Sequence, residues 1–551
     1  MGRQPRRRSG DDAGVNSALS EAKDPVRVSE GDPSPSSRLR MTLIALLIAV
    51  AAVALAQSWN RWLDPIIDTG RDLYIAEQVA HGTTLYRDIR YQYPPLTPYL
   101  LTAFTSIIGS SLAAFTAIGI AQSLAIAVLL WVALRKIAGF AAALLFVTLS
   151  FTGASTWGAN FVFPYAYAAT LGMLFLIGAL AAFVRRKNAI AIVLLIAASW
   201  CKVEYAAAAF LIVVVLAIAR RLKVMEAVVY IVAMCVTAVV AVAYFGPALR
   251  DNIFATTLTE GEIARRFFRN VSGLRHWPQN LGIAIASAAA IALIAWLLRT
   301  RSKVAIPAVI IAALLFNSDS FFRGWAILQL VALVFAFRER ESPLIFFSIF
   351  SIAATVRVAL AVSPAWYGCA LVVPVYALVA YVFFASPFRS QWWLAIIAMI
   401  CLRDLVDQHQ RYAVKQFPIV SSRGMFYDAN PDRARVLNEL IRTVKGPTLA
   451  VMPEGISLNY LTRTRTPLTF YMFTPPETAE PAIEARVLRE LRHNPPAEVA
   501  IVTRDVREYG FRGFGLDYDQ STLSYIIHNY SVTNVWPAPR FQAILFQHVS
   551  R

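Results

Sequence analysis

The stretch "MTLIALLIAVAAVALAQSW", residues 41–59, decides the fold of this chain. It is an apolar run of about 20 residues, the length with which an α-helix crosses the hydrocarbon core of a bilayer. A signal peptide is not expected, because the run ends in Gln57-Ser58-Trp59 without a small-x-small cleavage site and many apolar runs follow it. We therefore interpret it as the first span of a polytopic membrane protein.

The composition of the whole chain supports this interpretation. Of the 551 residues, 57% are hydrophobic and only 16% are charged, and the mean hydropathy is +0.54. These values lie outside the range of soluble globular proteins. The net charge of +18 comes from Lys and Arg in short clusters between apolar runs, where they set membrane orientation and form no single basic face. Nucleic-acid binding is therefore not expected.

About thirteen apolar runs are expected to be membrane helices, although several fall short of the usual span length. The basic clusters between them alternate, which predicts a cytoplasmic N-terminus and cytoplasmic basic loops. This alternation requires residues 188–219, interrupted by "WCKVEY", to form a hairpin of two short helices. The predicted helices cover residues 41–59, 111–134, 138–152, 165–184, 188–201, 204–219, 224–245, 279–298, 304–316, 325–337, 343–361, 366–385 and 391–407.

Three regions differ in composition. Residues 1–40 are rich in Arg, Ser, Asp, Gly and Pro, which predicts a disordered cytoplasmic tail. Residues 41–407 form the predicted transmembrane domain. Residues 408–551 have an ordinary soluble composition, with "TLAVMPEG", "EVAIVTRD" and "RFQAILFQ" as strands and "AIEARVLRELRHN" as an amphipathic helix. They predict a small α/β domain on the periplasmic face.

The first predicted outer loop, residues 60–95, is unusually rich in charged residues and tyrosines. Its segment "GRDLYIAEQVAHG" has helical spacing and is expected to lie on the membrane surface, and Pro94-Pro95 then returns the chain to the bilayer. A purely structural interpretation exists: Thr69 and Asp72 fit a T-x-x-D capping box, and Tyr91 and Tyr93 fit an interfacial aromatic belt.

The same loop carries a resemblance to a known family. Asp68-Thr-Gly-Arg71-Asp72-Leu-Tyr74, followed by Leu85-Tyr86-Arg87-Asp88 and Tyr93-Pro94-Pro95-Leu96, resembles the first external loop of bacterial GT-C glycosyltransferases of the PMT/RgtA-like group. That group is similar in architecture to protein O-mannosyltransferases and lipid A aminoarabinose transferases. The resemblance extends over most of residues 41–551, through "NFVFPYAYAAT", "WCKVEYA" and "PEGISLNYLTRTRTPLTFYMFTPP". One departure is Thr69, which stands where better-known relatives have Glu.

The resemblance implies a multi-pass enzyme of the bacterial inner (cytoplasmic) membrane. It would move a hexose or pentose, with inversion, from a polyprenyl-phosphate donor to a lipid, glycan or protein acceptor on the periplasmic face, with donor and membrane lipids as its partners. Such a reaction needs a carboxylate base and cations for the departing phosphate. We assign the base to Asp68. The predicted phosphate-binding residues are Arg71, Lys202 and Arg357, and the predicted substrate-binding residues are Asp72, Asp88, Tyr91, Tyr93 and Glu204.

Each cation also has a simpler interpretation. Arg71 lies one helical turn from Asp68 and would neutralise its carboxylate. Lys202 would pair with its neighbour Glu204, and Arg357 would extend to the lipid headgroups. The segment "LTEGEIARRFFRN" in residues 246–278 is either a lid over the site or an amphipathic helix on anionic headgroups.

Other functional classes stay open from the sequence. His81 and His276 are isolated, so no metal site is predicted, and a need for a divalent cation is left undecided. A polymerase or ligase of surface polysaccharide would use similar lipid-linked substrates. A secondary transporter would show repeated halves and helices broken at matching positions, which the sequence lacks. A receptor would keep the α/β domain without needing Asp68.

Overall fold

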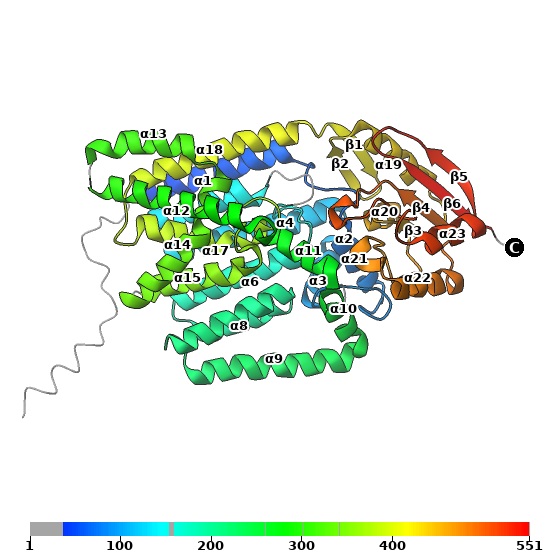
Figure 1. Cartoon of the computed structure of the whole chain (residues 1–551), viewed down its shortest axis with the longest axis horizontal. Helices are drawn as coiled ribbons and strands as arrows, with labels where there is room; N and C mark the ends of the chain where they lie inside the picture. The colour runs from blue at the N-terminus through cyan, green and yellow to red at the C-terminus, as the bar shows by residue number, and fades with distance from the viewer. Residues whose placement is uncertain (1–36, 154–158, 259–260, 301, 341, 550–551) are drawn as a thin grey trace, which may run out of the picture.

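The computed structural model describes residues 37–153, 159–258, 261–300, 302–340 and 342–549. Residues 1–36, which make up nearly all of the predicted N-terminal tail, lie outside the described residues, as do residues 154–158 of the segment 153–165, the second outer loop that the alternation of basic clusters predicts. In Figure 1 a bundle of helices occupies one end of the molecule, and the strands and the last helices occupy the other end.

Within the described residues, six helices are long and apolar enough to cross a membrane: α1, α4, α6, α9, α12 and α14. Each matches a predicted run. Shorter apolar helices complete the bundle, and α7 and α8 are separate, as the predicted hairpin at 188–219 requires. The bundle consists of α1 (Ser37–Ser58), α4 (Leu112–Leu134), α5 (Lys136–Phe146), α6 (Tyr167–Val184), α7 (Asn188–Ser199), α8 (Val203–Ile218), α9 (Val224–Phe245), α12 (Trp277–Thr300), α13 (Ala305–Leu315), α14 (Ser318–Arg338), α15 (Ser342–Thr355), α16 (Gly368–Leu371), α17 (Val373–Phe384) and α18 (Trp392–Ala413).

Polar residues set the ends of several helices. The side chains of Ser111 and Asn317 accept hydrogen bonds from backbone N–H groups in the first turns of α4 and α14, at 3.2 and 2.8 Å. Gly246 ends α9 with a φ of +70°, which a glycine adopts without strain. With Asn317 as its cap, α14 starts at Ser318, seven residues before the predicted run 325–337. The sequence placed the start too late because the first turns of the helix contain polar residues, which hide the apolar pattern.

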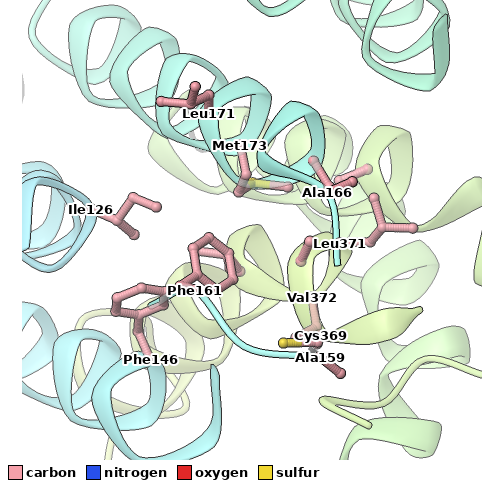
Figure 2. Close-up of a cluster of buried hydrophobic side chains, with 14 of the residues drawn as sticks. Ile126, Phe146, Ala159, Phe161, Ala166, Leu171, Met173, Cys369, Leu371 and Val372 are labelled. Carbon is pink, nitrogen blue, oxygen red and sulfur yellow. The ribbon is translucent and has the colours of Figure 1, made fainter. Parts of the chain in front are cut away.

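The bundle core holds residues 159–165 of the second predicted outer loop in place. Figure 2 shows Phe161 of this loop among side chains of α4, α5, α6 and α16, and its ring lies 5.1 Å from that of Phe146, edge to face. The Gln122 side chain donates a hydrogen bond to the Phe161 carbonyl at 2.8 Å. A Cβ at Gly119 would come within 1.8 Å of the Val162 carbonyl oxygen, so only glycine allows this approach of α4. Residues 159–165, which lead to the start of α6, are therefore held against the bundle.

The C-terminal region is an α/β unit, as predicted. Its four-stranded sheet has the order β3-β4-β6-β5, with β3 parallel to β4 and β6 antiparallel to both neighbours. The predicted strands are confirmed as β3 (Leu449–Met452), β4 (Glu498–Val502) and β6 (Ala543–His548), and the predicted helix as α22 (Pro481–His493). The sequence missed β1 (Phe417–Ser421), β2 (Gly424–Asp428), β5 (Tyr530–Trp536), α19 (Pro431–Thr443), α20 (Ile456–Thr462), α21 (Pro475–Thr478) and α23 (Gln520–Asn529).

Four helices lie where the bundle and the α/β unit meet (Figure 1): α2 (Gly70–Ala80), α3 (Leu96–Ile108), α10 (Pro247–Leu258) and α11 (Gly261–Val271). Eight of the eleven residues of α2 are buried, and the helix packs on α3 and α20. It is therefore covered by protein on more sides than a helix that simply rests on the membrane surface, which is what the sequence predicted. The capping box is also absent: the Thr69 side chain makes no cap hydrogen bond, and Asp72 instead accepts the Tyr167 N–H at 2.5 Å.

Replacing Gly70 with Ala should loosen this junction. A Cβ at Gly70 would lie 2.2 Å from the Ser457 Cβ at the start of α20, so α2 and α20 would have to separate. Overpacking of this kind costs roughly 1–3 kcal/mol, and we expect a lower unfolding temperature of the detergent-purified protein. Gly282→Ala is the control, because a Cβ there meets nothing within 4 Å. Equal unfolding temperatures for the two variants would contradict the tight contact.

Candidate active site

Asp68 lies in the loop just before α2, in an uncommon backbone conformation. Its φ is +53°, which few residues other than glycine adopt, although Asp tolerates it better than most. Its N–H donates a hydrogen bond to Glu454 Oε1 at 3.0 Å, and its carboxylate accepts one from Arg71 Nη1 at 3.4 Å. The side chain is 24% exposed, so an acceptor group can reach it.

The surroundings of Asp68 make it a stronger base than an ordinary aspartate. Burial raises the pKa of Asp68 above its ordinary value, although the positive charges of Arg71, Arg504 and Lys202 oppose this rise. Burial has this effect because it destabilises the charged carboxylate. A carboxylate with a raised pKa holds a transferred proton better, as general base catalysis requires.

Arg71 is completely enclosed. It donates hydrogen bonds through Nε to Asp72 at 3.2 Å, through Nη1 to Asp68 and through Nη2 to the Tyr165 carbonyl at 3.2 Å. Its guanidinium also lies over the Tyr93 ring, 4.8 Å from the centroid. Because the side chain has no exposed surface, this geometry favours the interpretation that Arg71 holds and neutralises Asp68 over direct contact with a phosphate.

Lys202, Glu204 and Arg357 form one ionic group. The pair of Lys202 and Glu204 that the sequence suggested is present, and Arg357 joins it. Lys202 precedes α8, and its Nζ lies 3.0 Å from Glu204 Oε2. The other oxygen, Oε1, pairs with Arg357, which lies in a 3-10 turn (Val356–Val358) directly after α15. Two cations share one carboxylate, so the group carries a net positive charge. Arg357 keeps 26% of its side chain exposed, which leaves it accessible to an anion.

Three tyrosines connect this ionic group to Asp68. The Lys202 ammonium lies over the rings of Tyr93 and Tyr165, at 5.1 and 5.5 Å, and 3.4 Å from the Tyr165 hydroxyl. Tyr165 packs edge to face on Tyr367 at 5.5 Å, and Arg357 lies 5.5 Å from the Tyr367 ring. Tyr93 and Tyr165 also contact Arg71, through the Tyr93 ring and the Tyr165 carbonyl, and Arg71 pairs with Asp68. Burial and then the negative charge of Asp68 raise the pKa of Tyr367.

The structure adds residues that the sequence did not identify. Glu454 and Arg504 approach Asp68 from the α/β unit, and Tyr509 lies beside them. The motif "PEG" marked Glu454 only as part of the family resemblance, and no local pattern marked Arg504. Phe267 of α11 packs on Tyr367 at 5.6 Å and on Tyr509 at 6.5 Å. This part of the loop 246–278 therefore covers the aromatic residues of the cluster.

Two predicted substrate-binding residues, Asp88 and Tyr91, are engaged in contacts within the protein. Asp88 pairs with Arg87 at 2.8 Å and accepts the Thr84 N–H at 2.8 Å, in an exposed turn. Tyr91 is fully buried, 5.6 Å from the Tyr93 ring, with no surface to offer a sugar. Both residues have structural roles here, whereas Asp72, Tyr93 and Glu204 lie in the cluster.

A separate cavity of about 910 Å³ shares two loops with the cluster. It is lined by Ala159 and Trp366, from the loops that carry Tyr165 and Tyr367, and by Asp404, Asp407 and Arg411 of α18. Among the residues that the structure describes, no three His, Cys, Asp or Glu side chains are grouped to hold a metal ion.

No protein-family model matches the chain, and no curated protein matches it. Among solved structures, the chain is similar to ArnT from Cupriavidus metallidurans bound to undecaprenyl phosphate, with 14% identity and a TM-score of 0.44 over 93% of this chain and 98% of that chain. It is also similar to the Archaeoglobus fulgidus oligosaccharyltransferase in complex with zinc and sulfate, with 12% identity and a TM-score of 0.45 over 83% and 67%. Both are GT-C fold glycosyltransferases. At these sequence identities, the similarity concerns the fold alone.

Proposed function

We propose that this chain is a membrane glycosyltransferase that moves a sugar from a polyprenyl-phosphate donor to an acceptor hydroxyl, with Asp68 as the general base. The observation that carries the proposal is the arrangement of one accessible carboxylate beside a net positive group at the ends of apolar helices. The positive charge of Lys202 lowers the pKa of Asp68 against the larger effect of burial. Lys202 and Arg357 both pair with Glu204. A base and an anion site are the two elements that the reaction needs.

The residues divide into three roles in this reaction. The acceptor oxygen bonds to the anomeric carbon, the bond from that carbon to the phosphate oxygen breaks, and its electron pair leaves with the phosphate. Asp68 takes the acceptor proton. Lys202 and Arg357 stabilise the charge that develops on the phosphate, and Arg71, Asp72 and Glu204 hold these groups in place. The Tyr93 ring contacts Arg71, which pairs with Asp68, on one side and Lys202 on the other, so we propose that it contacts the sugar.

The charge pattern supports a periplasmic site. Lys202 precedes α8, whereas the basic cluster 220–223 follows α8 at its other end. Arg357 follows α15, and the cluster 338–340 precedes that helix. If the basic clusters face the cytoplasm, as the positive-inside rule expects, the active site and the α/β domain of residues 408–551 face the periplasm, and residues 41–407 form the membrane domain.

Purified protein in liposomes tests this proposal with a panel of radiolabelled polyprenyl-phosphate sugars and added envelope lipids and glycans. We expect the label to leave one donor, to appear in a product of the acceptor fraction, and to release an equal amount of polyprenyl phosphate. Label that enters the liposome lumen without any bond change would instead identify a transporter. Binding of donor or acceptor without either event would identify a receptor.

A further inference from the structure

Glu454 of the α/β unit is buried directly against the loop that carries Asp68. Its Oε1 accepts the Asp68 N–H at 3.0 Å, and its Oε2 accepts a hydrogen bond from Arg504 Nε at 2.6 Å. Only 3% of the Glu454 side chain is exposed. A buried carboxylate with both oxygens bound has one preferred position, so Glu454 is fixed where it meets the loop.

The sheet brings the two partners together. Glu454 and Arg504 each follow the carboxyl end of a strand, β3 and β4, and these strands are parallel neighbours. Side chains that follow adjacent parallel strands lie at the same edge of a sheet. Arg504 also pairs with Glu508 Oε1 at 2.8 Å, which anchors the guanidinium from its other side.

The loop needs such a partner at this position. Asp68 has a left-handed backbone conformation, which is less favourable for an aspartate than the right-handed region, so contacts that hold the loop stabilise it. The hydrogen bond from its N–H to Glu454 joins residues 386 positions apart, and it adds to the local bond in which the Ile67 carbonyl accepts the Thr69 N–H at 2.6 Å. The direction of the Asp68 carboxylate therefore depends on Arg71, which binds it directly, and on the α/β unit, which holds its backbone.

We propose that Glu454 and Arg504 are positioning residues that hold Asp68 in the orientation required for proton transfer, so that the α/β unit completes the active site. This inference rests on the proposed function. The inference gives the α/β unit a contribution to catalysis, whereas its position beside the site would by itself suggest that it binds the acceptor. Neither residue contacts the phosphate-binding cations, so the donor should still bind when the pair is altered.

The charges around Asp68 predict how each variant changes the pH profile. Burial raises the pKa of Glu454, the charge of Arg504 opposes the rise and that of Asp68 adds to it, so the two carboxyls titrate as a pair. Removing the Glu454 charge should ease ionisation of Asp68, and removing the Arg504 charge should hinder it. The groups facing Asp68 are Arg71 and Asp72 of α2, Lys202 before α8, Tyr367 before α16, Glu454 after β3, and Arg504 and Tyr509 after β4.

The test measures transfer against pH for the full-length wild type, Glu454→Gln and Arg504→Gln in liposomes. We expect kcat to fall by up to about 10²-fold in both variants, the cost of a misplaced catalytic group, with little change in KM for the donor. The acidic limb of the profile should move to lower pH in Glu454→Gln and to higher pH in Arg504→Gln. Arg504→Lys keeps the charge and should recover part of the rate and the wild-type limb.

Glu477→Gln is the matched control, because it removes an ion pair between the same two regions, with Arg90 at 3.4 Å, that does not contact Asp68. Its pH limb should stay in place. A wild type that transfers no sugar overturns the proposed function and this inference with it. If the wild type transfers sugar but the limbs of both Gln variants stay where they are, only the positioning role is overturned. Unfolding temperatures of all variants show whether a change in rate comes from a loss of folded protein.

Discussion

Asp68→Asn should lower sugar transfer by about 10²- to 10⁴-fold, the contribution of a positioned general base. The amide keeps the size and polarity of the side chain but cannot accept the acceptor's proton. In the wild type, the rate should rise with pH through the raised pKa of Asp68, because only the carboxylate acts as base. Transfer measured from pH 5 to pH 9 in liposomes checks both statements.

The same variant separates catalysis from folding. Burial raises the pKa of Asp68, so the stability that its protonated form contributes is present below the ordinary aspartate pKa and is lost as pH rises through the raised value. Asn at this position keeps a side-chain oxygen that can accept the Arg71 hydrogen bond, so the unfolding temperature of the variant should stay close to that of the wild type. Asp251→Asn, at an exposed carboxylate paired with Arg250, is the control and should retain full transfer. Normal transfer by Asp68→Asn would remove Asp68 from the mechanism.

Much of the fold follows from local pattern. Apolar runs of spanning length predict α1, α4, α6, α9, α12 and α14, and the alternation of basic clusters predicts the break between α7 and α8 at Lys202. The sequence missed α3 because Thr97 and Pro98 interrupt its first turn. It also placed α2 on the membrane, because spacing predicts that a helix has an apolar side but not which surface covers it. That surface is α20, nearly four hundred residues later in the chain.

The sequence identified residues of the candidate site mainly where a charged side chain lies next to an apolar helix. Lys202 and Arg357 stand out because cations at the ends of apolar helices need a partner, and the structure gives both the same partner, Glu204. Asp88 and Tyr91 share the composition of the loop, but side-chain packing turns one to solvent and buries the other. Glu454 could not be assigned from the sequence, because its role depends on which strand edge faces the Asp68 loop.

Arg357→Gln and Lys202→Gln should each lower kcat by about 10²- to 10³-fold, as the loss of one group that stabilises a developing anion does. Each variant leaves Glu204 paired with the other cation, so the fold should persist. Glu204→Gln should act in the opposite direction on anion binding, because it frees both cations from their shared carboxylate. Polyprenyl phosphate, the proposed product, should therefore bind more weakly to the two cation variants and more tightly to Glu204→Gln than to the wild type.

Competition by unlabelled polyprenyl phosphate against a labelled lipid phosphate measures these affinities without depending on turnover. Arg323→Gln is the matched control: Arg323 pairs with Asp319 at 2.8 Å on α14 and is 25% exposed, close to the 26% of Arg357, but lies outside the cluster. It should bind the lipid as the wild type does. If Arg357 only extended to headgroups, its variant would match this control, and Glu204→Gln would leave the affinity unchanged. Opposite shifts from the two ends of one ion pair would instead require that the lipid phosphate competes with Glu204 for the same cations.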